Sequence, residues 1–143
     1  MADLVSKYPY PRNRFKRSIL KTEIGILTHL LSRFTILGKE NIPDDGPLIV
    51  VTNHFHFIDA PILILATPWP IEFRADFEMP NVPSLLKFFP DFYGTYEVAQ
   101  GTPNLGAMRA SEAVLAQNGV LGIFPEGRVH QPPLKAALPE RPI

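Results

Sequence analysis

The chain has 143 residues, of which 45% are hydrophobic and 20% are charged, and this balance excludes an intrinsically disordered protein. It contains no cysteine, which excludes a disulfide framework, a thiolate metal site and a cysteine nucleophile. The formal net charge is zero, yet residues 1–40 hold eight Lys or Arg against three Asp or Glu, an excess of five positive charges. Such a basic end favours an anionic partner, either a membrane or a nucleic acid, although a basic helix end that contacts only solvent has the same composition.

The N-terminal pattern predicts an irregular segment followed by a helix. Residues 1–15 contain Pro9 and Pro11 and predict an irregular basic segment, and residues 16–143 predict a single domain. From about Lys16 to Arg33 the apolar residues recur at helical spacing: Ile19, Leu20, Ile24, Leu27, Leu30 and Leu31. We expect this stripe to pack on the domain core, with the basic start of the helix free to contact lipid. The alternative is a helix that lies in the headgroup region of an anionic membrane.

The sequence predicts neither a signal peptide nor a transmembrane helix. Its first basic residues follow a polar, Pro-containing start, and no small-residue cleavage site follows the apolar run. The most apolar segment, residues 24–37, is interrupted by His29 and Arg33 and is shorter than the ~20 apolar residues that span a bilayer. We therefore expect a peripheral protein on the cytoplasmic face of a membrane.

Apolar runs of strand type alternate with helix signals along the rest of the chain. Strands are predicted at residues 34–37, 48–52, 71–75 and 120–124, with a weaker candidate at 93–98. The run at 48–52 has no polar alternation, which predicts burial on both faces. One helix is predicted after Asp59, which would cap it, and another from Thr102 to about Gln117. Residues 82–89 predict a short helix or loop, and the tail after Val129 is too rich in proline for a regular element. This alternation predicts an α/β fold, a mixed β-sheet flanked by helices.

The polar cluster after the run at 48–52 carries the first chemical signal. His54 and Asp59 lie five positions apart, where a loop that turns into a helix brings their side chains into contact. Neutral imidazole accepts a proton from an attacking alcohol, and a carboxylate on its other ring nitrogen fixes the tautomer. The spacing alone is a weak signal, because a single His followed by a single Asp occurs often by chance.

A second motif makes the signal specific. Asn53 and His54 with Asp59 form an Asn-His-x4-Asp block, and Phe124-Pro-Glu-Gly127 follows the later strand. These two blocks in this order resemble the glycerolipid acyltransferase family, the glycerol-3-phosphate and lysophosphatidic acid acyltransferases. The run from Gly38 to His54 is similar to the family's lead into its first block. The resemblance covers about residues 30–130.

The resemblance implies an O-acyltransferase of phospholipid biosynthesis. His54 would be the general base toward an acceptor hydroxyl, oriented by Asp59, and Asn53, Glu126, Gly127 and Arg128 would bind the acceptor. The hydroxyl would attack a thioester of coenzyme A or acyl carrier protein directly, as co-substrate, so the family implies no cofactor and no metal. The implied partners are a membrane surface, the lipid acceptor and acyl carrier protein.

The chain departs from the family pattern in two ways. Arg128 stands where the family often has Thr, Val129 where it has Arg, and Gln100 where it often has another Arg, which removes a cation from the expected phosphate site. Family members also continue well beyond the second motif, whereas this chain ends fifteen residues after Arg128. The resemblance therefore implies a domain that lacks its C-terminal part, either as a fragment or with a partner supplying the missing edge. We expect it to be poorly active alone.

Two other interpretations stay open. His54 and His56, two apart at a strand end, are a metal-ligand pair in some hydrolases, with Asp59 as a third ligand. The second interpretation is an inactive, membrane-associated remnant that binds lipid through its basic helix. A nucleic-acid partner is not expected, because the basic cluster lacks interleaved aromatic residues and any recognised binding motif.

Overall fold

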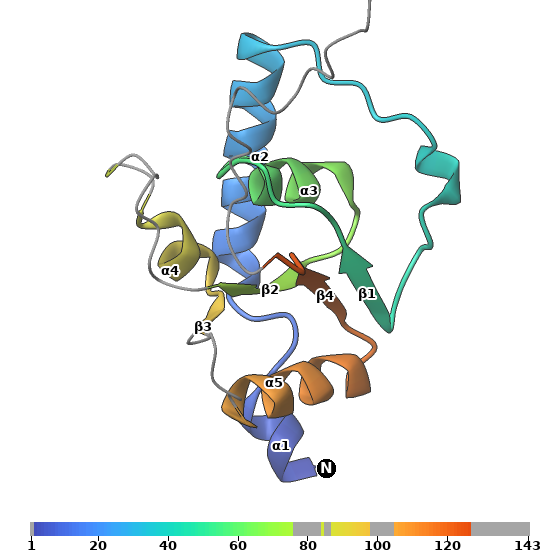
Figure 1. The fold of residues 1–143 in the computed structure, drawn as a ribbon, viewed down its shortest axis with the longest axis vertical. Helices are drawn as coiled ribbons and strands as arrows, with labels where there is room; N and C mark the ends of the chain where they lie inside the picture. Colours follow the sequence, from blue (N-terminus) through green and yellow to red (C-terminus); the bar gives the residue numbers. More distant parts are fainter. Residues whose placement is uncertain (1, 76–83, 85–86, 98–104, 127–143) are drawn as a thin grey trace, which may run out of the picture.

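The protein is described here from a computed structural model that covers residues 2–75, 84, 87–97 and 105–126 (Figure 1). The described strands form one parallel sheet in the order β1 (Leu48–Val51), β4 (Val120–Ile123), β2 (Ile71–Ala75) and β3 (Tyr96–Glu97). Each strand is followed by a helix before the next strand, a connection that returns the chain in the parallel direction. The α/β class is therefore confirmed, whereas the predicted mixed sheet is wrong for these strands, which pair only in parallel.

Helices cover both faces of this sheet (Figure 1). On one face lie α2 (Arg14–Leu31), α3 (Asp59–Ala66) and α4 (Phe89–Tyr93), and their core cluster with the strands contains Leu20, Ile64, Ile71, Phe73, Tyr93 and Val120. On the other face α5 (Leu105–Ala116), with α1 (Ala2–Lys7) packed against it, covers Leu121. Consecutive residues Val120 and Leu121 serve opposite faces, as the pleat of a strand requires. A single turn of 3₁₀ helix, η1 (Lys39–Asn41), lies in the connection from α2 to β1.

Several predicted elements form where the sequence places them. Strand β2 has the predicted bounds, β1 and β4 each end one residue earlier than predicted, and α2 begins and ends two residues earlier. The weak candidate at 93–98 contains the two residues of β3. The start of the predicted helix at Thr102, half of residues 82–89 and the Pro-rich tail lie outside the described residues.

Two predictions for the N-terminal half are wrong. Residues 1–15 are not wholly irregular, because Ala2–Lys7 form α1 before the two prolines. Residues 34–37 do not form a strand, and Leu37 is 89% exposed. Strand-type residues form a strand only where a sheet edge offers hydrogen-bond partners, and no described strand pairs with this segment.

The apolar pattern of α2 packs differently from the prediction. Leu20 is buried and Ile24 is partly buried against the core, but Ile19, Leu27, Leu30 and Leu31 are 38% to 82% exposed. Helices α3 and α4 contact one side of α2, and its C-terminal half extends beyond α3 (Figure 1). Core packing of the whole stripe is therefore wrong, because the helix carries apolar residues on a second face.

Strand β1 is also more exposed than predicted. It lies at the end of the strand order, and its burial alternates, with Ile49 53% and Val51 60% exposed. Their neighbours in register, Leu121 and Ile123, lie on the α5 face. In the described part of the chain α5 packs over β4, and the side chains of Ile49 and Val51 on that face of β1 remain exposed.

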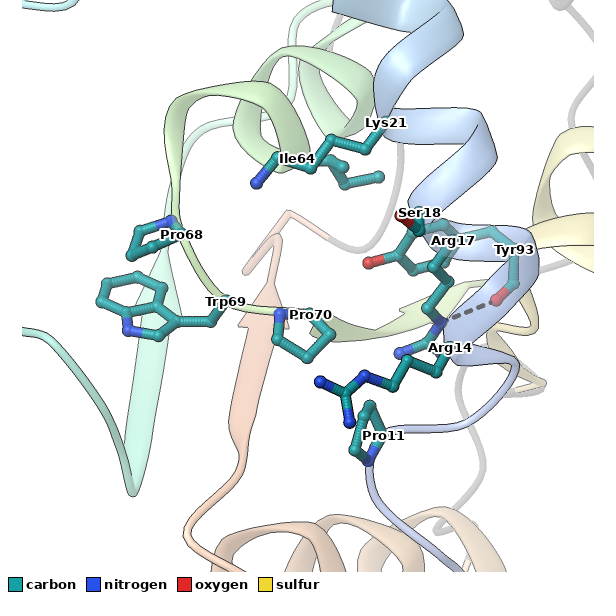
Figure 2. Close-up of a pocket in the computed structure, with 10 residues that line it drawn as sticks. All are labelled: Pro11, Arg14, Arg17, Ser18, Lys21, Ile64, Pro68, Trp69, Pro70 and Tyr93. Atoms are coloured by element: carbon teal, nitrogen blue, oxygen red, sulfur yellow. Dashed lines mark hydrogen bonds between the residues drawn. The ribbon is translucent and has the colours of Figure 1, made fainter.

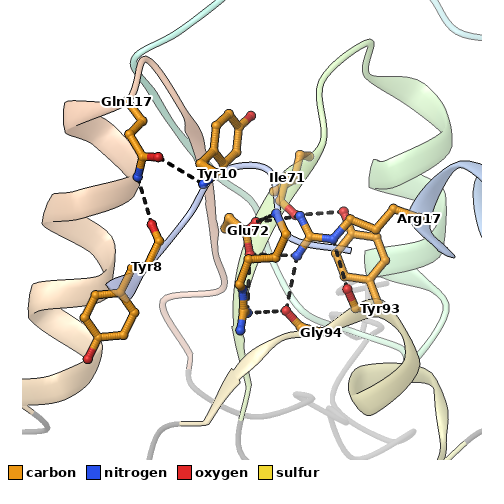
Figure 3. Close-up of polar contacts among 9 residues, drawn as sticks. Tyr8, Tyr10, Arg17, Ile71, Glu72, Tyr93, Gly94 and Gln117 are labelled. Carbon is orange, nitrogen blue, oxygen red and sulfur yellow. Dashed lines mark hydrogen bonds and ion pairs between the residues drawn. The ribbon is translucent and has the colours of Figure 1, made fainter. Parts of the chain in front are cut away.

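A buried ion pair joins α2 to the sheet (Figure 3). Arg17 donates to both carboxylate oxygens of Glu72, at 2.6 and 2.7 Å, and its Nε donates to the Tyr93 carbonyl at 2.9 Å. Glu72 is fully buried, and Arg12 reaches it as well, at 3.4 Å. The Tyr93 hydroxyl donates to the Ile71 carbonyl at 2.7 Å. Arg17, expected at the free basic start of the helix, is instead part of the interior.

Candidate active site

The two sequence motifs meet at one edge of the sheet. Strands β1 and β4 are parallel neighbours with Val51 opposite Ile123, and the Thr52 amide continues the ladder to the Ile123 carbonyl at 3.2 Å. His54 follows β1 by three residues, and Phe124 directly follows β4. The carboxyl ends of adjacent parallel strands are where α/β proteins place ligand sites. Residues seventy apart in sequence are therefore neighbours in space.

Asp59 holds the loop that carries His54. Its Oδ2 lies 3.2 Å from His54 Nδ1 and accepts hydrogen bonds from the amides of Phe55 and His56, both at 2.7 Å. The Asp59 amide in turn donates to the His56 carbonyl at 3.1 Å. One carboxylate oxygen thus has three donors, and together they fix both the loop and the imidazole ring.

This arrangement corrects the predicted helix cap. The position before α3 is Ile58, which makes no side-chain capping bond, and Asp59 is the first residue of the helix. Its side chain turns back to the preceding loop instead of capping the helix. A carboxylate in the first turn is still favoured, because the amino end of a helix carries partial positive charge.

An aromatic stack supports the other side of the imidazole. The His54 ring lies on Phe124 with centroids 4.1 Å apart and an interplanar angle of 22°, and Phe124 in turn stacks on Phe73 at 5.9 Å and 10°. The Phe73 ring has room because residue 122 is glycine: a Cβ there would lie 2.5 Å from the ring. The sequence therefore fixes His54 from two directions, by Asp59 and by the first residue of the second motif.

This geometry makes His54 chemically competent as a base. With Nδ1 directed at the carboxylate, the proton of a neutral imidazole resides on Nδ1, and Nε2 presents its lone pair away from Asp59. The two side chains are only partly covered, 18% exposed for His54 and 24% for Asp59. Both side chains of this pair therefore remain in contact with solvent.

The remaining predicted site residues are placed less completely. Asn53 is exposed between β1 and His54, and Glu126 is exposed in the turn after β4. Gly127 and Arg128 lie outside the described residues. The site edge thus contains His54, Asp59, Asn53 and Glu126, whereas the expected cation for an acceptor phosphate is not among the described residues.

His56 is not arranged as a partner of His54 in metal binding. Its ring packs on Phe57 with centroids 4.2 Å apart, and its Nδ1 accepts from the Ile58 amide at 3.5 Å. Across the described residues, no three His, Asp or Glu side chains gather in a way that could hold a metal ion. The arrangement favours acid–base chemistry over the metal interpretation.

Sequence reasoning missed the supporting residues. The sequence presents Phe124 only as part of a motif, and it gives no signal for Phe73 or Gly122. One signal points to Phe124, since it is the last residue of the buried strand predicted at 120–124, at the sheet edge where the other motif emerges. The contacts of the Phe55 and His56 amides have no side-chain signal and become visible only in the folded loop.

Comparison with known proteins gave one match. The model of the family described as Acyltransferase matches residues 33–137, well over half of the chain, a span that includes both motifs and all four strands. No curated protein and no solved structure matches the chain. None of the described helices combines the length and apolar content that a bilayer-crossing helix needs.

Proposed function

This chain belongs to the glycerolipid acyltransferase family, and from that premise we propose that it transfers a fatty acyl group to a hydroxyl of a lysophospholipid or of glycerol phosphate. The acyl donor is a thioester of coenzyme A or acyl carrier protein. The observation that supports this reaction most strongly is the contact of His54 Nδ1 with Asp59, which leaves Nε2 available to the acceptor.

The proposed reaction is a direct transfer. Nε2 of His54 removes the proton of the acceptor hydroxyl as its oxygen attacks the thioester carbonyl. The tetrahedral intermediate collapses with cleavage of the carbon–sulfur bond, and the imidazolium returns the proton to the departing sulfur. Asp59 stabilises the imidazolium in between and holds the ring in place. The products are an ester and a free thiol.

Asn53, Glu126, Gly127 and Arg128 are proposed to bind the acceptor. Asn53 and Glu126 lie at the same sheet edge as His54, and Arg128 follows Glu126 by two residues in the sequence. A guanidinium pairs with phosphate through two parallel hydrogen bonds, which suits the role. The acyl acceptor would then enter with its phosphate toward the second motif and its hydroxyl toward His54.

We also propose a peripheral membrane location, because the proposed acceptor is a lipid. Four apolar residues of α2 form an exposed face opposite its buried side: Phe15, Ile19, Ile26 and Leu30, between 38% and 77% exposed. At 100° per residue these four project within about 60° of one another, so they make one stripe. Such a stripe supports a helix that lies on the cytoplasmic face of a membrane.

The absence of cysteine makes the test simple. Because the chain has no thiol of its own, a thiol reagent detects only the coenzyme A that is released from palmitoyl-CoA in the presence of lysophosphatidic acid or glycerol 3-phosphate. His54→Ala should lower this acceptor-dependent rate by about 10²–10⁴-fold, the usual contribution of a general base. His56→Ala is the matched control and should keep the rate.

Three results would argue against the proposal. Acceptor-dependent release of coenzyme A that persists in His54→Ala would show that His54 is not the general base. Release that stops on addition of a chelator and returns with zinc would favour the metal hydrolase. No release from the wild-type chain, with retained binding to liposomes, would favour the inactive remnant.

A further inference from the structure

An opening in the described part of the protein lies away from His54. A cavity of about 410 Å³ is lined by the first half of α2, by Ile64 of α3 and by the segment Pro68–Pro70 that leads into β2 (Figure 2). Pro70 precedes the amino end of β2, whereas His54 follows the carboxyl end of β1. The cavity and the candidate active site therefore lie at opposite ends of a parallel sheet.

The wall of this cavity carries positive charge without a carboxylate among its lining residues. Three of these residues are cations, Arg14, Arg17 and Lys21, and Arg17 pairs with Glu72, which Arg12 contacts as well. Lys21 Nζ donates to a neutral group, the Thr67 carbonyl, and Arg14 is exposed, with no ion pair among the described residues. Arg14 and Lys21 therefore line the opening without a carboxylate partner among the described residues.

The surroundings of Lys21 point in the same direction. Burial lowers the pKa of Lys21, and the positive charge of Lys39 lowers it further. Both effects reflect an ammonium group that has lost water and gained a like charge, without an anion beside it. An anionic ligand would remove this penalty.

Apolar groups complete the cavity and continue onto the neighbouring surface. Trp69 and Tyr93 line it together with Ile64 and three prolines. On α2, Arg14 and Ser18, which line the cavity, directly precede Phe15 and Ile19 of the exposed apolar stripe. A ligand with an anionic head in the cavity could therefore extend its apolar chains along the helix surface that we assign to the membrane.

We propose that this cavity is a second lipid site, which binds the phosphate group of an anionic phospholipid apart from the catalytic edge. The guanidinium of Arg14 and the ammonium of Lys21 donate to the phosphate oxygens, with the Ser18 hydroxyl beside them. Trp69 contacts the glycerol and the first methylenes of the acyl chains. The site orients α2 on an anionic membrane and does not depend on the proposed acyl transfer.

The protein contains its own reporter for this site. Trp69 is the single tryptophan of the chain and lines the cavity, so its fluorescence reads ligand binding there directly. Titration with dioctanoyl phosphatidic acid should give a saturable change. Dioctanoyl phosphatidylcholine, whose phosphate carries a choline cation, should bind at least tenfold more weakly, as should glycerol 3-phosphate, which lacks the acyl chains.

Matched charge variants test the assigned residues. The double variant Arg14→Gln/Lys21→Gln should bind phosphatidic acid about 30-fold more weakly. Each cation beside an anionic headgroup contributes roughly fivefold to the affinity, and the two factors multiply. Lys7→Gln with Arg33→Gln removes the same charge from exposed positions outside the cavity and should bind like wild type. Urea unfolding of both double variants shows whether each retains the wild-type fold.

Separate results overturn the separate parts of the proposal. Equal binding of phosphatidic acid by the Arg14→Gln/Lys21→Gln protein and by wild type would refute a phosphate site at these two residues. Glycerol 3-phosphate binding as tightly as phosphatidic acid would replace the phospholipid by a soluble phosphate compound. His54→Ala should leave the Trp69 titration unchanged, so failure of acyl transfer and failure of this site are distinguishable; a lost titration in that variant would place the lipid at the catalytic edge instead.

Discussion

The negative charge of Asp59 can be removed by a nearly isosteric change, Asp59→Asn. In the wild type, His54 Nδ1 and the amides of Phe55 and His56 all contact Oδ2 of Asp59. The amide oxygen of asparagine in the same position can still accept these three hydrogen bonds. The loop should therefore keep its conformation, and the stabilisation of a charged His54 during acyl transfer should be lost.

The size of the loss follows from the geometry. The nearest atoms are 3.2 Å apart, which places the two charge centres about 4 Å apart, and at an effective dielectric constant of about 20 their attraction is roughly 4 kcal/mol. About a fifth of each side chain is open to solvent, and screening reduces this to roughly 2 kcal/mol. We expect the rate of acyl transfer to fall about 30-fold in Asp59→Asn.

The comparison with Asp59→Ala separates charge from position. Alanine removes the acceptor of all three hydrogen bonds, so we expect a greater loss of rate and, in addition, a loss of roughly 1–3 kcal/mol in the free energy of unfolding. Initial rates of coenzyme A release and urea unfolding measure the two effects. If Asp59→Asn transfers acyl groups within twofold of wild type while His54→Ala does not, the carboxylate has no electrostatic role and our reasoning is refuted.

Further predictions concern the support of the site and the fold. Gly122→Ala places a Cβ 2.5 Å from the Phe73 ring and should lower the free energy of unfolding by roughly 1–3 kcal/mol. Gly25→Ala in α2, where the nearest neighbour is 3.5 Å away, should raise it by roughly 0.5–1 kcal/mol. Urea unfolding measures both changes. Arg17→Met leaves the buried Glu72 carboxylate with only Arg12 and should cost roughly 3–5 kcal/mol, while the exposed Arg33→Met should change little. Burial raises the pKa of Tyr93 far above its usual 10.0, so the folded protein keeps a proton that the unfolded chain loses. The free energy of unfolding of the wild type should then fall as the pH rises above 10, by up to about 1.4 kcal/mol per pH unit from this group. Urea unfolding at pH 9 to 11 should show a shallower fall in Tyr93→Phe. An equal dependence on pH in the two proteins would contradict a raised pKa of Tyr93.

The sequence was sufficient where a local pattern decides the structure. Continuous apolar runs located β1, β2 and β4, and periodic spacing located α2 to within two residues at each end. The contact of His54 with Asp59 also followed from a local feature, a turn between a strand and a helix. Its role in catalysis stays a prediction until the variants are assayed.

The sequence was insufficient where a distant partner decides the structure. Helix α2 carries apolar residues on two faces, and only the packing of α3 and α4 selects which face is buried. Arg17 resembles its basic neighbours in sequence and is buried only because Glu72 lies opposite it. Phe124 supports His54 through the order of strands in the sheet, which no local spacing encodes.

The loop of His54 is anchored mainly through its backbone, and this has a consequence for how the site could diversify. Asp59 binds amide groups of Phe55 and His56, and the Phe55 side chain remains 53% exposed. Because these hydrogen bonds use the backbone, substitutions at the two positions can leave the support of His54, the proposed base, in place. Proline alone is excluded there, because it would remove an amide donor. The loop thus separates the fixed part of the chemistry from the variable part of recognition.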